Sequence, residues 1–164
     1  MTALWNATDP APQVLVLLGS ESDLPVVEKM PALLERFGLT HGTAVASAHR
    51  QPERLHELVR AAERGGTQVF VAAAGMAAHL PGVVASLTGR PVIGVPVASG
   101  PLAGVDALLS IVQMPPGVPV ATVAIGSAGA RNAACLAARI IGVADARVAA
   151  AVEDYRRELA AGGR

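Results

Sequence analysis

Two polar loops carry the residues whose types and spacing could do chemistry. The first has the sequence GSESD at residues 19–23 and stands directly before a helical pattern. The free N–H groups and partial positive charge of a helix N-terminus bind phosphate, and the two serine hydroxyls would add donors. An ordinary helix-capping turn explains the same residues. The loop does not match the glycine-rich loops of nucleoside-triphosphate or dinucleotide sites.

The second polar loop, SAHRQP at residues 47–52, combines a histidine with an arginine. The Arg50 guanidinium can hold a phosphate through two hydrogen bonds. His49 has a side chain that titrates near neutral pH, so it is the natural group to carry a proton during a reaction. An exposed pair without a role is the alternative that the placement of these residues leaves open.

A third loop, AGMAAHLPG at residues 74–82, is small, apolar and uncharged. Small residues let a ligand approach the backbone closely. Its single titratable group is His79, for which we expect a structural or positioning role rather than catalysis. We expect no metal site, because His49, His79 and Asp23 lack the spacing of a metal motif. The one cysteine, Cys135, is expected to be an inert core residue.

Short apolar runs alternate with helical patterns along the chain. The run VLVLL contains no polar residue, which is typical of a strand buried on both faces of a parallel sheet. Elsewhere apolar residues recur at helical spacing, with glycine or proline at the ends of the pattern. The patterns predict strands at residues 14–18, 40–46, 68–73, 91–95 and 118–125, and helices at 24–37, 52–64, 76–87, 102–112, 127–141 and 144–160.

This alternation predicts a three-layer α/β fold with a parallel five-stranded sheet and an additional C-terminal helix. We expect the flavodoxin-like strand order 2-1-3-4-5. The single domain should span residues 13–160, after a flexible lead-in at 1–12 and before a loose tail at 161–164. In such sheets ligands bind beyond the carboxyl ends of the strands, where the strand order reverses. The three loops should therefore meet at one site.

Composition excludes several classes of protein. The chain has 164 residues, of which 52% are hydrophobic and 16% charged, so it is not a disordered chain. A net charge of zero offers no indication of a surface for nucleic acid or for an anionic membrane. No apolar run reaches the roughly 20 residues of a membrane span, and the N-terminus does not resemble a signal peptide. We therefore expect a cytoplasmic protein with no nucleic-acid or membrane partner.

The charges are unevenly distributed along the chain. Residues 65–130 contain only two formal charges, Arg90 and Asp106. The predicted helices at 76–87 and 102–112 therefore lack the polar outer face of a surface helix, and a helix without such a face is usually buried on all sides. In a small domain, further burial requires other subunits, so we expect these helices to form the core of a homo-oligomer.

Several motifs together resemble one enzyme family. GSESD, SAHR and AAHLPG, followed by GVPV, SIVQMP and AIGSAGARNAA, are similar to class I PurE enzymes, the N5-carboxyaminoimidazole ribonucleotide mutases of purine biosynthesis. The resemblance runs from about residue 14 to residue 142. The chain departs from it at Met76, where the family usually has a second glycine, and at Ala46, where valine is common. Class II enzymes lack AAHLPG, so the resemblance favours class I.

The resemblance implies a flavodoxin-like subunit in a homo-octamer with no metal or organic cofactor. The reaction moves a carboxyl group from the exocyclic nitrogen to C4 of an aminoimidazole ribonucleotide. His49 matches the catalytic histidine, Arg50 and the serines would hold the phosphate, Asp23 would hold the ribose, and the apolar loop would surround the reacting carboxyl group. The residues that match the family's substrate-binding positions are Ser20, Ser22, Asp23, Ser47, Ala48, Arg50, Ala74, Gly75, Ala77, His79 and Leu80.

The chemistry of this reaction suits the residues. A proton must move between nitrogen and carbon, which requires a group that titrates near neutrality, and CO2 must be retained in a pocket with little water. Binding energy from the distant phosphate can position the ring without a cofactor. Two alternatives are open. One is a carboxylase that uses free CO2 and the uncarboxylated nucleotide. The other is a flavodoxin-like binding module without catalysis, against which His49 counts.

Overall fold

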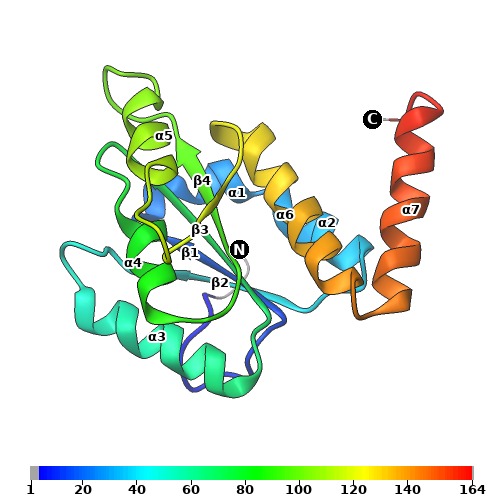
Figure 1. The fold of residues 1–164 in the computed structure, drawn as a ribbon, viewed down its shortest axis with the longest axis horizontal. Helices are drawn as coiled ribbons and strands as arrows, with labels where there is room; N and C mark the ends of the chain where they lie inside the picture. Colours follow the sequence, from blue (N-terminus) through cyan, green and yellow to red (C-terminus); the bar gives the residue numbers. More distant parts are fainter. Residues whose placement is uncertain (1–3, 164) are drawn as a thin grey trace.

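A computed structural model describes residues 4–163 as a parallel sheet covered by helices on both faces (Figure 1). The sheet has five strands in the order β2-β1-β3-β4-β5. The predicted fold class and strand order are therefore confirmed. The strands are β1 (Val14–Leu18), β2 (His41–Val45), β3 (Val69–Gly75), β4 (Val92–Val97) and β5 (Ala121–Thr122).

The central strands have no polar residues because both of their faces are buried. No residue of β1 is more than 2% exposed, and all of β4 is buried as well. The parallel register aligns Leu18 of β1 with Val45 of β2 and Ala73 of β3, and it aligns Gly75 of β3 with Val97 of β4. These four strands therefore end at the same edge of the sheet, and the loops that follow them lie side by side.

The helices form two layers (Figure 1). On one face the even-numbered residues of β1 pack against α1, α2 and α6, and on the other face Leu15 and Leu17 pack against α3, α4 and α5. The first layer comprises α1 (Leu24–Val27), α2 (Met30–Arg36) and α6 (Gly126–Gly142), and the second α3 (Pro52–Gly65), α4 (Leu80–Leu87) and α5 (Val105–Val112). The predicted C-terminal helix is α7 (Ala146–Ala160), which packs on α6 outside the sheet.

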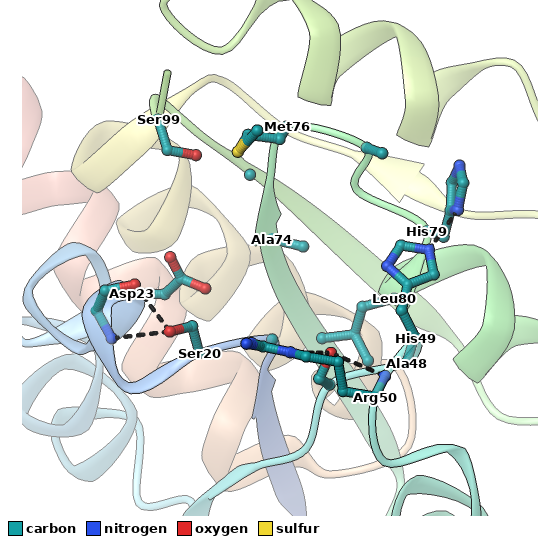
Figure 2. Close-up of a pocket in the computed structure, with 15 residues that line it drawn as sticks. Ser20, Asp23, Ala48, His49, Arg50, Ala74, Met76, His79, Leu80 and Ser99 are labelled. Atoms are coloured by element: carbon teal, nitrogen blue, oxygen red, sulfur yellow. Dashed lines mark hydrogen bonds between the residues drawn. The ribbon is translucent and has the colours of Figure 1, made fainter.

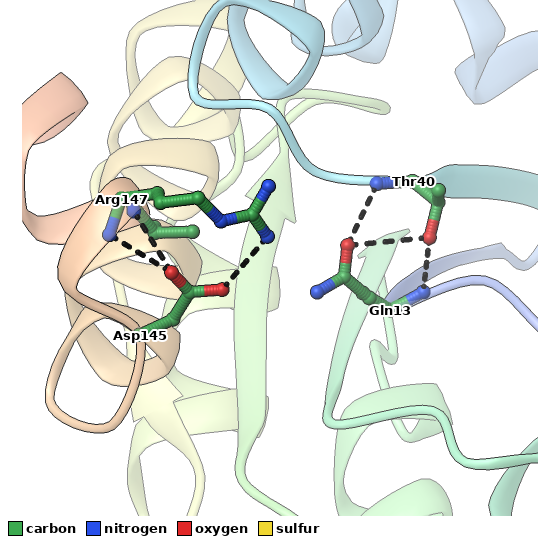
Figure 3. Close-up of polar contacts among 5 residues, drawn as sticks. Gln13, Thr40, Asp145 and Arg147 are labelled. Atoms are coloured by element: carbon green, nitrogen blue, oxygen red, sulfur yellow. Dashed lines mark hydrogen bonds and ion pairs between the residues drawn. The ribbon is translucent and has the colours of Figure 1, made fainter.

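A reciprocal pair of hydrogen bonds joins the beginnings of β1 and β2 (Figure 3). The Gln13 backbone N–H donates to Thr40 Oγ1 at 2.9 Å, and the Thr40 backbone N–H donates to Gln13 Oε1 at 3.0 Å. The Val14 N–H also donates to the Thr40 carbonyl at 3.1 Å. Because this pairing is fixed at the residue immediately before each strand, it helps to set the register that reaches the other edge of the sheet.

The last helix is held at both ends. Asp145 caps its N-terminus, where the carboxylate accepts hydrogen bonds from the backbone N–H groups of Arg147 and Val148 (Figure 3). Near its C-terminus the Tyr155 ring packs edge-on against Phe37, with ring centroids 5.6 Å apart. The cap satisfies donors that a helix N-terminus otherwise leaves free, so α7 is well defined although it packs mainly on α6.

Several element boundaries differ from those that the sequence predicted. The helix predicted at 24–37 is interrupted, because Pro31 has no N–H and α2 begins anew at Met30. The helix predicted from residue 76 begins at Leu80, since Met76 has a φ of 54°, outside the right-handed helical region. The helix predicted from residue 102 begins at Val105, after two residues with positive φ.

The fifth strand is the largest difference. The sequence predicted a strand at 118–125, but β5 has two residues, which pair with Ile93 and Gly94 of β4. This strand lies at the edge of the sheet, and Pro119 has no N–H to donate to a ladder. A short edge strand is also less open to pairing with other chains.

The segment before β1, for which we expected flexibility, contacts the domain in its described part. Trp5 is buried, its backbone N–H donates to the Thr43 carbonyl at 2.7 Å, and its indole N–H donates to the Pro10 carbonyl at 3.0 Å. The segment thus covers part of β2. Within residues 4–163, no helix is both long and apolar enough to cross a bilayer.

The close packing of α5 on β4 depends on Gly94. A Cβ atom at this position would lie 2.4 Å from Ile111 Cγ2 and 2.8 Å from Val120 Cγ1. We predict that Gly94→Ala lowers the free energy of unfolding by about 1–3 kcal/mol, because the buried neighbours must move to admit the methyl group. Chemical denaturation monitored by circular dichroism measures this change.

The control is Gly89→Ala, at a loop position where a Cβ atom would meet no neighbour within 4 Å. This variant should be as stable as the parent protein or slightly more stable, because alanine restricts the unfolded chain. Equal stability of the two variants would contradict the proposed constraint at Gly94.

Candidate active site

One cavity at the carboxyl edge of the sheet contains all twelve residues that the sequence nominated (Figure 2). Its volume is about 430 Å³. The loops that follow β1, β2, β3 and β4 contribute its walls. Three further residues, Gly19, Met76 and Ser99, also line the cavity.

The serine loop after β1 forms a single turn of 3₁₀ helix, η1 (Glu21–Asp23). Ser20 caps this turn, because its Oγ accepts a hydrogen bond from the Ser22 backbone N–H at 3.3 Å. The Ser22 hydroxyl lies 2.9 Å from Ser20 Oγ. The capping turn that we considered as an alternative is therefore present. It also fixes both hydroxyls at the wall of the cavity, and Ser20 Oγ, which accepts both contacts, keeps its own proton to donate to a ligand.

Asp23 is the acidic residue of the cavity and is only 7% exposed. Burial raises the pKa of its carboxyl above the usual range, and a hydrogen bond from the Ser20 backbone offsets only part of this rise. A carboxylate accepts hydrogen bonds through both oxygens, so Asp23 is suited to hold hydroxyl groups of a ligand.

The loop after β2 brings Arg50 to the floor of the cavity. The Arg50 backbone N–H and Nε–H both donate to Ser47 Oγ, at 3.3 and 3.4 Å. Figure 2 shows the guanidinium extended toward Ser20, which comes from a different strand. No carboxylate of residues 4–163 forms an ion pair with Arg50. One end of the cavity therefore combines an unpaired positive charge with serine hydroxyls, as an anion site requires.

Two histidines meet at the side of the cavity (Figure 2). His49 Nε2 and His79 Nδ1 are 2.7 Å apart, and the rings are almost perpendicular, at 78°. One nitrogen must donate to the other, so this contact couples the protonation of the two facing nitrogens and restricts the orientation of both rings. His79 is therefore placed to hold the His49 ring in one orientation.

The remaining wall of the cavity is formed by backbone atoms and small apolar side chains. Ala74 and Gly75 end β3, and Ala77 and Leu80 continue the wall into α4. A Cβ atom on Gly75 would lie 1.8 Å from Ser99 Oγ and 3.1 Å from Ser99 Cβ, so a side chain here would displace Ser99. This wall offers no charged side chain, and a small apolar group bound there would be partly shielded from water.

Sequence reasoning missed Ser99, although a signal was available. The predicted order already placed the fourth strand beside the third, so the loop after it belonged to the same edge of the sheet. The strand predicted at 91–95 stopped two residues before the observed end at Val97, and no candidate residue was nominated in the loop that follows. Met76 was not nominated as a site residue, although its departure from the family's glycine suggested a narrower pocket or a different backbone angle at this position.

The other two histidines and the single cysteine of the chain lie apart from the cavity. His41 contacts Glu35 at 3.3 Å, and His56 lies on α3. Cys135 is half-buried between α6 and α7, and burial raises the pKa of its thiol, which agrees with an unreactive residue. Within residues 4–163, no group of three or more His, Cys, Asp or Glu side chains could hold a metal ion.

The comparison with known families decides the classification. A family model described as AIR carboxylase matches residues 13–161. The chain belongs to the AIR carboxylase family. The match covers the whole sheet and all the loops of the cavity, so every residue that lines the cavity lies within the region that the family model describes.

The similarity to individual proteins supports this classification. A protein from Pyrococcus abyssi is 52% identical over 148 residues, which cover 90% of this chain and 84% of that protein. A protein from Thermotoga maritima is 50% identical over 148 residues, covering 90% of this chain and 85% of its own length. Both are named N5-carboxyaminoimidazole ribonucleotide mutase.

A solved structure of the family has the same fold. The crystal structure of Treponema denticola PurE superposes with a TM-score of 0.83 at 31% sequence identity, covering 91% of this chain and 92% of that one. A second crystal structure, of a variant of the same organism's enzyme, superposes with a TM-score of 0.81 at 30% identity, covering 91% of each chain.

The buried carboxyl of Asp23 should reduce stability at neutral pH. Because its pKa is raised on folding, the folded protein holds this proton to a higher pH than the unfolded chain, and stability falls as the pH rises through that interval. We predict that Asp23→Asn raises the melting temperature by a few degrees at pH 7. The gain should shrink as the pH falls toward the ordinary aspartate pKa of about 4.

Differential scanning fluorimetry from pH 4 to pH 8 tests this dependence. Glu21→Gln in the same turn is the control, since Glu21 is exposed and should not change the melting temperature. A gain for Asp23→Asn that is equal at every pH would show that burial of the charge is not its cause.

Proposed function

We propose that the protein is an N5-carboxyaminoimidazole ribonucleotide mutase of purine biosynthesis. It would move the carboxyl group from the exocyclic nitrogen to C4 of the aminoimidazole ring. The observation that carries this proposal is that the anion site at Arg50 and the His49–His79 pair open into the same cavity. Membership of the AIR carboxylase family and the names of relatives at about half identity support it.

In this proposal the polar end binds the ribonucleotide. Arg50 and the hydroxyls of Ser20, Ser22 and Ser47 hold the phosphate, and Asp23 accepts hydrogen bonds from the ribose hydroxyls. These contacts are remote from the bond that breaks. Their binding energy therefore serves to hold the ring in position against the histidines and the apolar wall.

The reaction would proceed through loss and recapture of CO2. The bond between the exocyclic nitrogen and the carboxyl carbon breaks and releases CO2, and the electron-rich ring then attacks CO2 through C4 to form a carbon–carbon bond. The proton on C4 leaves, and the exocyclic nitrogen gains one. His49 would carry this proton as general acid and base. The hydrogen bond to His79 would hold the His49 ring in the required orientation.

The apolar wall would shelter the CO2 between these two steps. Ala74, Gly75, Ala77 and Leu80 offer backbone and small apolar groups, so CO2 could lie against them with few competing water molecules. No step in this scheme needs an organic cofactor or a metal, because proton transfer and positioning are sufficient for it.

A carboxylase is the second candidate, because the family description names that activity. It would bind free CO2 and the uncarboxylated ribonucleotide in the same cavity, and His49 would remove the C4 proton. The AAHLPG loop favours the mutase through its resemblance to class I enzymes.

We also propose that the protein works in the cytoplasm as a homo-oligomer, with the octamer as the state that the resemblance implies. Four apolar side chains on and just before α5 are 49–59% exposed, namely Leu102, Val105, Leu109 and Val112. On the same helix, Asp106 Oδ1 is buried and has no hydrogen-bond partner among the described residues. Exposed apolar surface beside an unsatisfied buried acceptor supports coverage by a second copy. By contrast, α4 is largely covered within the subunit, so α5 is the principal candidate for this contact.

We predict that the protein isomerises N5-carboxyaminoimidazole ribonucleotide and that His49→Asn lowers kcat about 100-fold or more, because the proton carrier is removed. Binding of the nucleotide should survive, since asparagine leaves the anion site intact. Product absorbance measures turnover, and isothermal titration calorimetry measures nucleotide binding.

The control for this experiment is His56→Asn on α3, which should keep normal turnover. Near-normal turnover of His49→Asn would reject His49 as the proton carrier. Conversion of the uncarboxylated nucleotide with bicarbonate, but not of the carbamate, would identify a carboxylase. Binding without conversion of either compound would identify a binding module.

For the assembly, we predict that Leu109→Arg reduces the oligomer to smaller species, because a buried guanidinium without a partner is costly at an interface. Gel filtration coupled to light scattering measures the mass. Val143→Arg is the matched control, since Val143 is 89% exposed and follows α6 rather than α5. A parent protein that is monomeric would contradict the proposed contact.

A further inference from the structure

Met76 has a backbone conformation that glycine adopts far more easily. Its φ is 54°, and Ala103 is the only other non-glycine residue with positive φ in the described part of the chain. A side chain is sterically unfavourable in this region, whereas glycine has no Cβ atom to clash. The protein therefore keeps a methionine where glycine would relieve strain, and strain that persists beside a cavity is grounds for a functional hypothesis.

The conformation of Met76 turns the chain immediately after β3. Gly75 is still paired with Val97 in the sheet, and within the next three residues the Ala78 N–H donates to the Met76 carbonyl at 2.9 Å and the His79 N–H donates to the Ala77 carbonyl at 2.8 Å. This tight turn brings His79 to its contact with His49. Glycine would support the same turn, so the turn alone does not explain the side chain.

The Met76 side chain stands at the rim of the apolar end of the cavity. It is 57% exposed, and Figure 2 shows its thioether on the side of Ser99, above Ala74. Gly100 lies beside it, since a Cβ atom there would be in ordinary contact with Met76 Cγ at 3.7 Å. Methionine is flexible and polarisable, so it can move aside for a ligand and pack over it afterwards.

We propose that Met76 is a specificity-determining residue, whose thioether forms an apolar lip that retains CO2 at the reacting end of the cavity. This inference rests on the proposed mutase reaction. Released CO2 has two fates: C4 attacks it and forms the carboxylated isomer, or it leaves. In the second case the exocyclic nitrogen takes up a proton, and the products are CO2 and the uncarboxylated aminoimidazole ribonucleotide. The lip favours the first fate.

The experiment measures how turnover divides between these products. Purified protein and the variants Met76→Leu, Met76→Gln and Met76→Gly are given N5-carboxyaminoimidazole ribonucleotide, and the isomer and the uncarboxylated nucleotide are separated by chromatography. Decarboxylation in a blank without protein is subtracted. Glutamine keeps the Cβ atom and the length of methionine but makes the lip polar, glycine removes the lip and relieves the strain, and leucine keeps the lip apolar.

We expect Met76→Gln and Met76→Gly to raise the share of uncarboxylated nucleotide among the products about threefold or more. Losing one fitted apolar contact in a small pocket changes selectivity by about this much. Met76→Leu should keep the parent division of products. The KM should change little in all three variants, because the phosphate end is intact. The melting temperature of Met76→Gly should not fall, which separates the effect from misfolding.

An unchanged division in the glutamine and glycine variants would overturn the role of Met76 and leave the mutase activity standing. A leucine variant that loses as much CO2 as the glutamine variant would also overturn it, because an apolar lip would then not be what matters. Failure of the parent protein to form the isomer would overturn both this inference and the proposed function.

Discussion

The cavity depends on the pairing of β3 with β1 and β4. This pairing aligns Leu18 with Ala73 and Gly75 with Val97, so the serine loop, the apolar loop and Ser99 leave the sheet at the same edge. The absence of a side chain at Gly75 lets the loop after β4 come within contact of the strand end. A shift of register by one residue would turn every buried side chain of these strands to the other face, so the position of the site is tied to the stability of the core.

The sequence allowed the fold and most of the cavity to be predicted, because both follow from patterns within short segments. Apolar runs mark buried strands, and the rule that ligands bind at the carboxyl ends of such strands brings the three loops together. Val14–Leu18 is predicted to the residue for this reason. The twelve nominated residues share one cavity because they lie at the carboxyl ends of strands or in the segments that follow them.

The predictions differ from the structure where an unusual backbone conformation, or a contact between residues far apart in the sequence, determines the local structure. The residue types at Met76 and Ala103 usually form helices, so the starts of α4 and α5 were predicted too early. At Met76 the glycine usual in the family was the one hint of a left-handed conformation, whereas Ala103 offered none. The contact between His49 and His79 joins residues 30 positions apart and depends on the turn at residues 76–79. The short β5 reflects its place at the sheet edge, which local composition does not reveal.

The segment between β4 and α5 has a consequence for how copies of the protein would communicate. Ser99 at the cavity is separated from the first residue of α5 by only five residues, and Gly94 holds α5 directly on the strand that ends near Ser99. In the proposed oligomeric enzyme, a nucleotide that favoured one conformation of this segment would also favour one position of α5. Such preferences are reciprocal, so in that case nucleotide affinity and subunit association would be thermodynamically linked.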